Sequence, residues 1–317
     1  MLYLTGSTLF LFSIYPMANS SKKIKEIGED LLIKRITKNL TLGKDVMAGA
    51  GDDCAVIKSN DPQSYMLLKI DSVIEGIHYV KSTPPSAVGY KALSRAISDI
   101  AAMGGTPKHA MIGLSLRPNC NVSYVTSLYN GLSKASSPYN ISIVGGETTN
   151  CSKNGTQSVT ISLTGEVRKD LCCFRSKGRS GQSLFVTGKL GKSINGRHLS
   201  FTPRIEEAQW LTRNFKIRAM MDLSDGLASD LPRLAKSSNC GYSIDTNKIP
   251  RARGASIDEA LCDGEDYELL FAISSKDCNK LKASWRKKFP NLTLTRIGKL
   301  SPKGTEDPDL EGGWQHF

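Results

Sequence analysis

The sequence lacks the motifs of several large enzyme classes. Its 317 residues contain no G-x-x-x-x-G-K-[ST] segment, which excludes a Walker-type phosphate loop, and no G-x-S-x-G turn, which argues against an α/β-hydrolase. The eight cysteines form no C-x-x-C pair and no zinc-knuckle spacing, so a zinc site is not expected. We predict reduced thiols and a cytoplasmic location.

Aromatic residues and long apolar runs are also scarce. Aromatics make up 7% of the chain and do not gather in basic stretches, which disfavours a nucleic-acid-binding protein. The apolar run at residues 10–14 is too short to span a bilayer, and no basic residue precedes it as in a signal peptide. We therefore expect no membrane segment, and residues 1–21 to be disordered or an over-extended start.

The remaining composition is that of an ordinary globular protein with a basic surface. The net charge of +12 favours anionic partners such as nucleotides or phosphorylated metabolites, without choosing among them. The length suggests about two domains. Hydrophobic periodicity predicts an α/β domain over 22–167 and a second domain over 168–317. The expected helices lie at 26–40, 87–103, 122–135, 201–215 and 226–237, and the expected strands at 54–57, 66–71, 110–116, 141–144, 158–167, 184–187, 219–222 and 269–273.

Acidic residues recur where the apolar segments begin or end. Asp52 and Asp53 are adjacent and follow glycines, and two such carboxylates repel each other unless cations bind them. Further acids stand at Asp71, Asp99, Glu147, Asp222 and Asp225. Each alone is usually a solvated side chain, but their recurrence in a basic protein favours an oxygen-only magnesium site.

Three other features each allow two interpretations. Gly145 and Gly146 either form a turn or bring backbone amides close to a phosphate. Ser224 and Asp225 are good helix N-cap residues, although capping leaves Asp222 unexplained. The C-terminal aromatics, Trp314 among them, either pack in a core or stack on a flat ring.

Many carboxylates without an evident catalytic base fit one kind of phosphoryl transfer. When the acceptor is itself a phosphate, its oxygen is already deprotonated and needs no strong base. The difficulty is to bring two polyanions together, and several divalent ions overcome that repulsion.

The acidic segments, taken in order, resemble the thiamine-monophosphate kinase family of the aminoimidazole-ribonucleotide-synthetase-like superfamily. The resemblance extends from Gly28 to Phe317. The matching segments are GE at 28–29 with LI at 32–33, GDDCA at 51–55, Asp71 with EG at 75–76 and His78, SDIAAMG at 98–104, GGETT at 145–149, DLSDGL at 222–227 and GEDYEL at 264–269.

The resemblance implies transfer of the ATP γ-phosphate onto thiamine monophosphate, with several Mg²⁺ ions. It also implies an N-terminal α/β domain that dimerises through a β-barrel, so a homodimer, followed by an α+β domain. The implied magnesium ligands are Asp53, Asp71, Asp99, Glu147, Asp222 and Asp225. The implied ATP contacts are Gly146, Glu147, Arg175 and Ser224, and the implied thiamine contacts are His78, Glu265 and Trp314.

The chain departs from the family pattern near the expected metal cluster. Lys69 and Ile70 stand where the family has small hydroxyl residues, Glu147 replaces the usual Asp, and Asp263 replaces a Gly. In a strand, Lys69 shares a face with Asp71, so its ammonium group is expected to replace one magnesium ion. Two alternatives stay open: a same-superfamily ATP-dependent enzyme with another phosphorylated or amide acceptor, and a non-catalytic nucleotide- or RNA-binding protein.

Overall fold

The structure is a computed structural model that describes residues 22–305, 310 and 312–314. The chain divides into two compact units, residues 1–39 with 315–317 and residues 40–314. In the first unit, helix α1 (Gly28–Thr37) confirms the expected helix and is shorter at both ends. The expectation for residues 1–21 lies outside the described residues.

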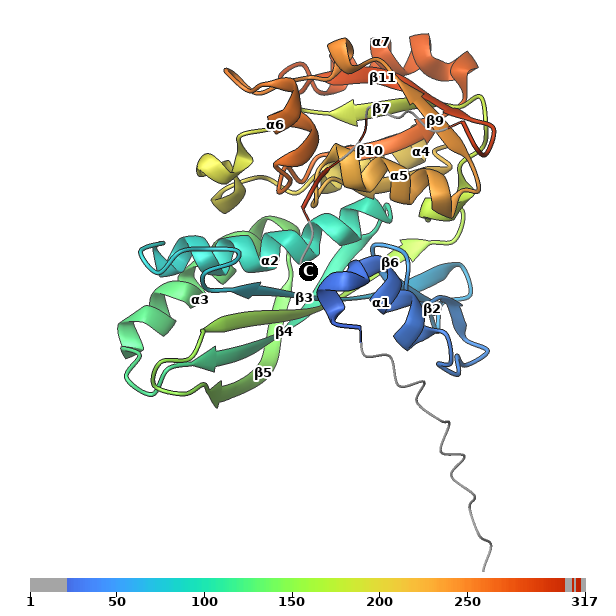
Figure 1. The fold of residues 1–317 in the computed structure, drawn as a ribbon. Coiled ribbons are helices and arrows are strands. Elements are labelled where there is room, and N and C mark those ends of the chain that lie inside the picture. The colour runs from blue at the N-terminus through green and yellow to red at the C-terminus, as the bar shows by residue number, and fades with distance from the viewer. Residues whose placement is uncertain (1–21, 306–309, 311, 315–317) are drawn as a thin grey trace, which may run out of the picture. The chain divides into compact units, whose positions relative to one another are not determined.

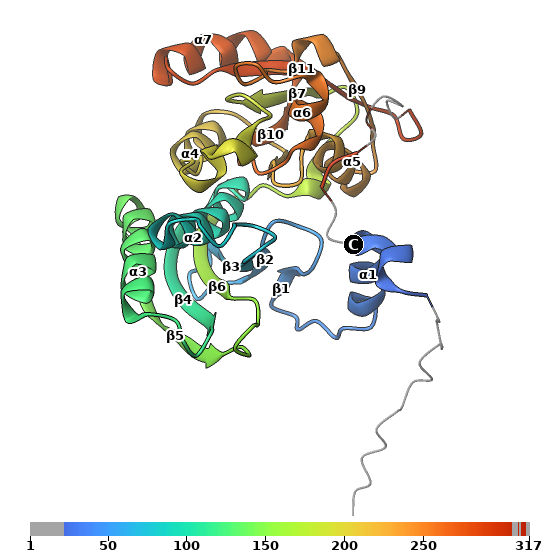
Figure 2. The same ribbon diagram turned by 60° about the vertical axis from the view of Figure 1, so that its left-hand side comes forward.

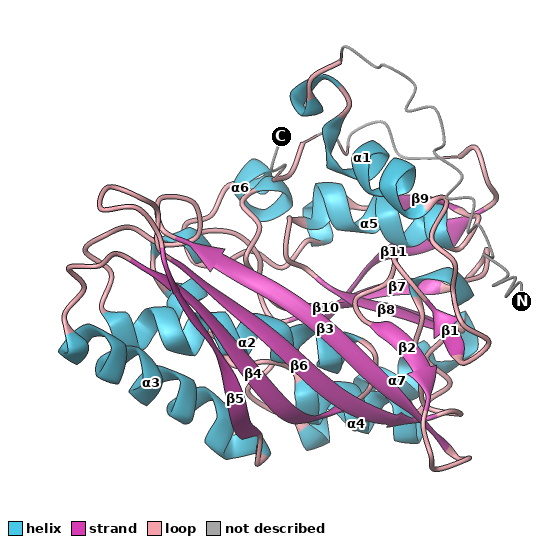
Figure 3. Cartoon of the chain, turned by 90° about the horizontal axis from the view of Figure 1, so that it is seen from below, coloured by secondary structure: helices cyan, strands magenta, loops and turns pink. Residues whose placement is uncertain are grey.

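The larger unit is built on two β-sheets (Figures 1 and 3). The first sheet has the order β1-β2-β3-β6-β4-β5 and the second the order β8-β10-β7-β11-β9. Only the β4–β5 pair is parallel among the described strand pairs. The strands are β1 (Val46–Ala48), β2 (Ala55–Lys58), β3 (Ser64–Ile74), β4 (Thr106–Leu116), β5 (Ser142–Asn150), β6 (Ser158–Arg168), β7 (Ser183–Thr187), β8 (Ala219–Asp222), β9 (Gly241–Ile244), β10 (Leu269–Ile273) and β11 (Leu294–Ser301).

Helices cover one face of the first sheet and surround the second. Figure 2 shows α2 (Pro85–Ala102) and α3 (Val122–Ser136) side by side over the first sheet. Helix α2 also contacts α4 and β8, so it lies between the two halves of this unit. The other helices are α4 (Ile205–Asn214), α5 (Leu227–Ser237), α6 (Ile257–Cys262) and α7 (Cys278–Lys288). The expected mixture of helices and strands is thus observed as an α/β fold with two sheets, and the first sheet is open along its described strands.

Strand β3 shows how the alternating sequence decides which side chains face the helices. Leu67 and Val73 are buried, whereas Met66 and Leu68 are exposed on the opposite face. Because successive side chains point to opposite faces, Lys69 shares the covered face with Leu67. The strand therefore carries two charged residues, Lys69 and Asp71, under α2.

The segment around Gly145 and Gly146 differs from the expected strand over 141–144. Strand β5 runs on through both glycines to Asn150, so the pair is neither a turn nor a loop. A Cβ atom on Gly146 would lie 1.9 Å from the carbonyl oxygen of Ile112 in β4. Close strand contact therefore explains the missing side chain at Gly146.

The capping interpretation of Ser224 and Asp225 is wrong. The N-cap of α5 is Gly226, and the buried carboxylate of Asp230 accepts hydrogen bonds from the backbone N–H groups of Ser224 and Asp225, both at 3.0 Å.

The sequence analysis also missed β1, β9, β11, α6 and α7, whose apolar residues are few or irregularly spaced.

Gly131 of α3 allows α2 and α3 to pack closely together. A Cβ atom on Gly131 would lie 1.8 Å from the carbonyl oxygen of Ser86. We expect Gly131→Ala to lower the free energy of unfolding by about 1–3 kcal/mol because the helices must move apart, although alanine favours helix. Urea denaturation measures the effect. Asn130→Ala, at an exposed position of the same helix, is the control, and an unchanged midpoint for Gly131→Ala would contradict the packing.

None of the helices within the described part of the chain combines the length and hydropathy needed to cross a bilayer. The eight cysteines all lie in the described part of the chain, and no disulfide joins any two of them.

Candidate active site

Three acids far apart in the sequence meet at one point. Asp53 precedes β2, Asp99 lies in the last turns of α2, and Asp222 ends β8. All three are buried, and one carboxylate oxygen from each lies within 4.8 Å of the others. We call these three residues the acid triad. An oxygen-only donor set of this size fits Mg²⁺, which prefers hard carboxylate ligands.

Asp222 accepts a hydrogen bond from a neutral side chain of α2. The hydroxyl of Ser98, on α2, donates to Asp222 Oδ2 at 2.5 Å and fixes the carboxylate. Burial and the neighbouring Asp53 carboxylate raise the pKa of Asp222 to about 7. Binding of a cation stabilises the ionised form of such a buried carboxylate.

The other two acids of the triad contact side-chain cations. Arg175 pairs with Asp53 through both ends of its guanidinium, with Nε 3.3 Å from Asp53 Oδ2. Lys69 Nζ lies 2.7 Å from Asp99 Oδ1. Burial opposes the charge on Lys69, but the Asp99 and Asp71 carboxylates outweigh it and raise the pKa of Lys69. Both cations therefore remain charged at neutral pH.

Three predicted metal ligands lie outside the triad. Asp71 is close to Arg95, whose Nε is 3.0 Å from Asp71 Oδ2. Asp225 pairs with Arg233 on α5. Glu147 is exposed on β5. The structure therefore brings three of the six predicted acids together, and the three others occupy different environments.

Two of the predicted thiamine contacts meet at a lysine that the sequence analysis did not consider. Lys91 is fully buried on α2, and its ammonium donates to the His78 carbonyl at 2.6 Å and to Glu265 Oε2 at 2.7 Å. His198 Nδ1 lies 2.7 Å from both Lys91 Nζ and Glu265 Oε2. The ring nitrogen Nδ1 of His78 accepts the Ile74 amide at 3.1 Å. This group of residues ties α2 to the loop before β10.

Charge in this group is set by burial and close pairing. Burial lowers the pKa of Lys91 to about 8 against the pull of Glu265, so the lysine stays largely protonated at neutral pH. Burial opposes ionisation of Glu265, yet hydrogen bonding to His198 and the Lys91 charge lower its pKa to about 2. Burial and the Arg95 charge lower the pKa of His78 to about 4, so this imidazole is neutral. The result is an anionic Glu265 held in one position.

The loop after β8 connects the remaining predicted residues. The Ser224 carbonyl accepts the Glu265 amide at 2.6 Å, and the Asp225 carbonyl accepts the Trp314 amide at 2.8 Å. Trp314 is 46% exposed, so it is not a core aromatic. The loop after β8 therefore begins directly after Asp222 and contacts both Glu265 and Trp314. Gly146, in contrast, lies on β5 in the other sheet.

Lys91 and Arg95, which the sequence analysis missed, carry a recognisable signal together with the predicted Asp99. Lys91, Arg95 and Asp99 are four residues apart, and therefore share one face of α2. Three charged residues at helical spacing inside a largely apolar helix indicate a buried polar surface. Ser98 carried no such signal, because a serine is common in helices without a polar partner.

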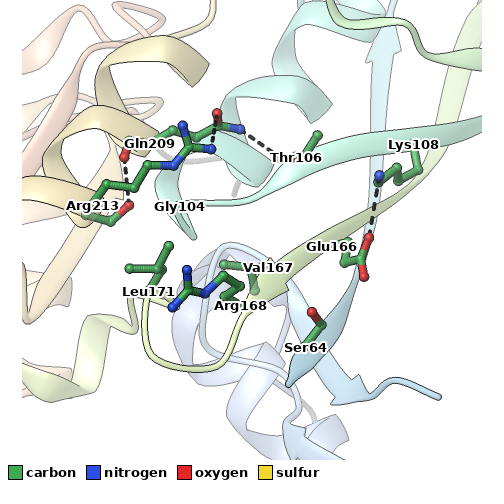
Figure 4. Close-up of a pocket in the computed structure, with 11 residues that line it drawn as sticks. Ser64, Gly104, Thr106, Lys108, Glu166, Val167, Arg168, Leu171, Gln209 and Arg213 are labelled. Atoms are coloured by element: carbon green, nitrogen blue, oxygen red, sulfur yellow. Dashed lines mark hydrogen bonds and ion pairs between the residues drawn. The ribbon is translucent and has the colours of Figure 1, made fainter. Parts of the chain in front are cut away.

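A surface pocket of about 360 Å³ lies apart from these residues, between the first sheet and α4 (Figure 4). Its charged side chains are mostly paired: Lys108 points to Glu166 at 3.5 Å and Arg213 to Gln209 at 3.3 Å. Another, of about 480 Å³, is lined by the Glu75–Arg117 pair. Neither pocket includes a residue of the acid triad.

The stability of the metal-free protein should fall as pH rises towards 7. Burial and the Asp53 carboxylate raise the pKa of both Asp52 and Asp222 from 3.8 to about 7, so between these values the folded state binds more protons than the unfolded state. The free energy of unfolding contributed by these groups therefore decreases with pH across that range. Urea denaturation in EDTA at pH 5 and pH 8 measures it, and the Asp222→Asn variant should show a smaller decrease. Equal slopes for both proteins would contradict the assignment.

Comparison with known proteins defines the class. The model of the AIR synthase related protein N-terminal domain matches residues 51–167, and that of the C-terminal domain matches residues 178–310. The chain is thus a two-domain α/β protein of the AIR synthase-related superfamily.

Closer relatives identify the family. The thiamine-monophosphate kinase of Aquifex aeolicus (strain VF5) is 34% identical over 331 residues, covering 93% of this chain and 100% of that protein. The enzyme of Haemophilus influenzae (strain ATCC 51907 / DSM 11121 / KW20 / Rd) is 33% identical, covering 87% and 90%. The solved structure of AaThiL complexed with AMPPCP and TMP has a TM-score of 0.79 at 31% identity, covering 94% of this chain and 100% of that chain. The chain belongs to the thiamine-monophosphate kinase family.

Proposed function

We propose that this chain transfers the γ-phosphoryl group of ATP to the phosphate of thiamine monophosphate, forming thiamine diphosphate and ADP. The observation that carries the proposal is the convergence of Asp53, Asp99 and Asp222 in a member of this family. The AaThiL complex with AMPPCP and TMP, an ATP analogue and the phosphorylated acceptor, agrees with it.

The acid triad would hold Mg²⁺, which when bound neutralises phosphate charge and polarises the transferred group. Arg175 keeps the Asp53 carboxylate oriented, and Ser98 does the same for Asp222. The acceptor phosphate needs no general base because its oxygen is already deprotonated. Orientation and charge neutralisation are therefore the main tasks of these side chains.

The acceptor would be held next to the loop after β8, by Glu265 and Trp314, whose amides hydrogen-bond to that loop. The anionic Glu265 suits the positively charged thiazolium ring, and the exposed Trp314 offers a flat surface for stacking. His78 contributes through its carbonyl, which fixes Lys91 and hence Glu265. Thiamine monophosphate would thus be bound by its ring, with its phosphate directed to the triad.

Further roles in this site complete the proposal. Asp225, which now pairs with Arg233, and the exposed Glu147 would serve as additional metal ligands once nucleotide is bound. The proposed ATP contacts are Gly146, Glu147, Arg175 and Ser224. The Ser224 hydroxyl and the Arg175 guanidinium are donors that suit anionic phosphate oxygens.

A homodimer would cover the exposed face of the first sheet. Large apolar side chains on this face are exposed to solvent, with Ile70 at 70% and Val144 at 60% exposed. The remaining members of this patch are Met47, Met66, Leu68 and Met111. A second copy packed sheet against sheet would bury them and form the family's β-barrel. Sedimentation equilibrium tests this, and a monomer at micromolar concentration would contradict it.

We also place the domain boundary between β6 and β7, near Arg168. The two family models end and begin on either side of it, at residues 167 and 178. The free cysteines favour a cytoplasmic location for the enzyme.

Turnover measured with and without acceptor tests the proposed function. ADP release from ATP and Mg²⁺ should depend on thiamine monophosphate, and thiamine diphosphate should form in equal amount. Unphosphorylated thiamine is the matched control, because it has the ring but lacks the acceptor phosphate. ADP release with thiamine, or with no acceptor, at the same rate would contradict the proposal.

A further inference from the structure

Four carboxylates and three cations make up the acid triad and its immediate surroundings. The carboxylates are those of the triad and Asp71, and the cations are Lys69, Arg95 and Arg175. Asp53, Asp71 and Asp99 each face one of these cations directly. The cluster that resembles a multi-ion site in sequence is therefore largely neutralised by its own side chains.

Lys69 is well placed to act as a permanent counter-ion. Its Nζ lies 2.7 Å from Asp99, within hydrogen-bond distance, and Asp71 stands two residues along on the same face of β3. Its side chain is 22% exposed, so the ammonium group is partly desolvated. Its electrostatic attraction to the carboxylates is therefore stronger than it would be at the surface. No rearrangement is needed to bring it there.

Arg95 completes the arrangement from α2, one turn before Asp99. Its Nε lies 3.0 Å from Asp71, and neither Nε nor the buried Nη1 has a hydrogen-bond partner among the described residues. The guanidinium is thus held by charge and burial rather than by a satisfied set of hydrogen bonds. Asp71 is consequently paired with a cation before any metal arrives.

We propose that Lys69 and Arg95 are fixed cations that take the place of divalent ions, so that this enzyme binds fewer Mg²⁺ ions than its carboxylates suggest. Asp71 acts as a counter-ion for Arg95 and Lys69, not as a metal ligand. One divalent ion then belongs to the triad, and a second arrives with the nucleotide phosphates. This inference rests on the proposed function, since it concerns the same centre.

Counting bound Mn²⁺ by electron paramagnetic resonance in the presence of AMPPCP tests the inference directly. The wild-type chain is expected to bind one ion on the triad and one with the nucleotide. Lys69→Thr is expected to bind one more ion, whereas Lys69→Arg, which keeps the charge, should match the wild type. An equal or smaller ion count for Lys69→Thr would overturn the proposal.

Thermal unfolding supplies a second readout that does not depend on turnover. In EDTA, Lys69→Thr should melt below the wild type because Asp99 loses its cation, and Mg²⁺ should raise its melting temperature more than it raises that of the wild type. An equal Mg²⁺-dependent shift would count against the proposal. If Lys69→Thr does not fold, three or more ions on the wild-type chain would overturn it. Failure of the proposed function is distinguishable, because it appears as ADP release that ignores thiamine monophosphate.

Discussion

Asp222→Asn is expected to lower turnover at least about a hundredfold and, in the same protein, to raise the stability of the metal-free fold. The asparagine has nearly the same shape and still accepts the hydrogen bond from Ser98. It lacks the charge that would bind a divalent ion, and loss of one preorganised charged group at such a centre typically lowers the rate by about 10²–10³-fold. Steady-state ADP release with thiamine monophosphate measures this loss.

The stability change should have the opposite sign because the ionised Asp222 is destabilising without metal. Burial and Asp53 raise its pKa to about 7, so at pH 8 the folded protein holds a charge that the unfolded chain accommodates more easily. Asp222→Asn should therefore melt higher than the wild type in EDTA at pH 8, and Mg²⁺ should add less to its melting temperature. Asp170→Asn, an exposed acid, is the matched control. A variant that is both active and less stable would contradict the metal role.

Lys91→Met is expected to destabilise the protein by about 3–5 kcal/mol, as removal of one partner from a buried ion pair typically does. Lys91 is fully buried, and its loss leaves the Glu265 carboxylate and the His78 carbonyl without their shared donor. Methionine fills similar space, so the effect reports charge and hydrogen bonding rather than a cavity. Urea denaturation at pH 7 measures it, with Lys287→Met at an exposed position of α7 as the control.

Kinetics on the same variant separate a structural role from a binding role. If Glu265 holds the acceptor, a folded Lys91→Met enzyme should show a KM for thiamine monophosphate raised about tenfold or more, with a smaller change in the KM for ATP. Equal changes in both constants would indicate general loosening of the site. An unchanged KM for thiamine monophosphate would contradict the role of Glu265.

The sequence predicted those elements whose periodicity is strong and uninterrupted. Helix α2 and strand β3 carry regular apolar stripes. The predicted strand over 66–71 lies inside β3, and the predicted helix over 87–103 matches α2 except for its last residue. The predicted strand over 141–144 ends too early, at the residue before Gly145, because a Gly-Gly pair usually breaks a strand. Here the pair stays in the strand because β4 passes too close to Gly146 for a side chain.

The site was only partly predictable because its members are joined by long-range packing. Asp222 meets Ser98 across 124 positions of sequence, and Lys91 meets Glu265 across 174. The position of an acid at the end of an apolar segment says that it lies near an edge, not which other acids it meets. Asp71 and Asp225 share that position with Asp222, yet each pairs with an arginine.

The most direct measurement of the central proposal is a crystal structure with AMPPCP and Mn²⁺, using the anomalous signal of manganese. We predict a manganese peak within coordinating distance of carboxylate oxygens from Asp53, Asp99 and Asp222, and no peak between Asp71 and Arg95. Bound nucleotide with its manganese elsewhere, and the triad oxygens contacting only Lys69, Arg175 and Ser98, would contradict a metal-assisted phosphoryl transfer at this centre.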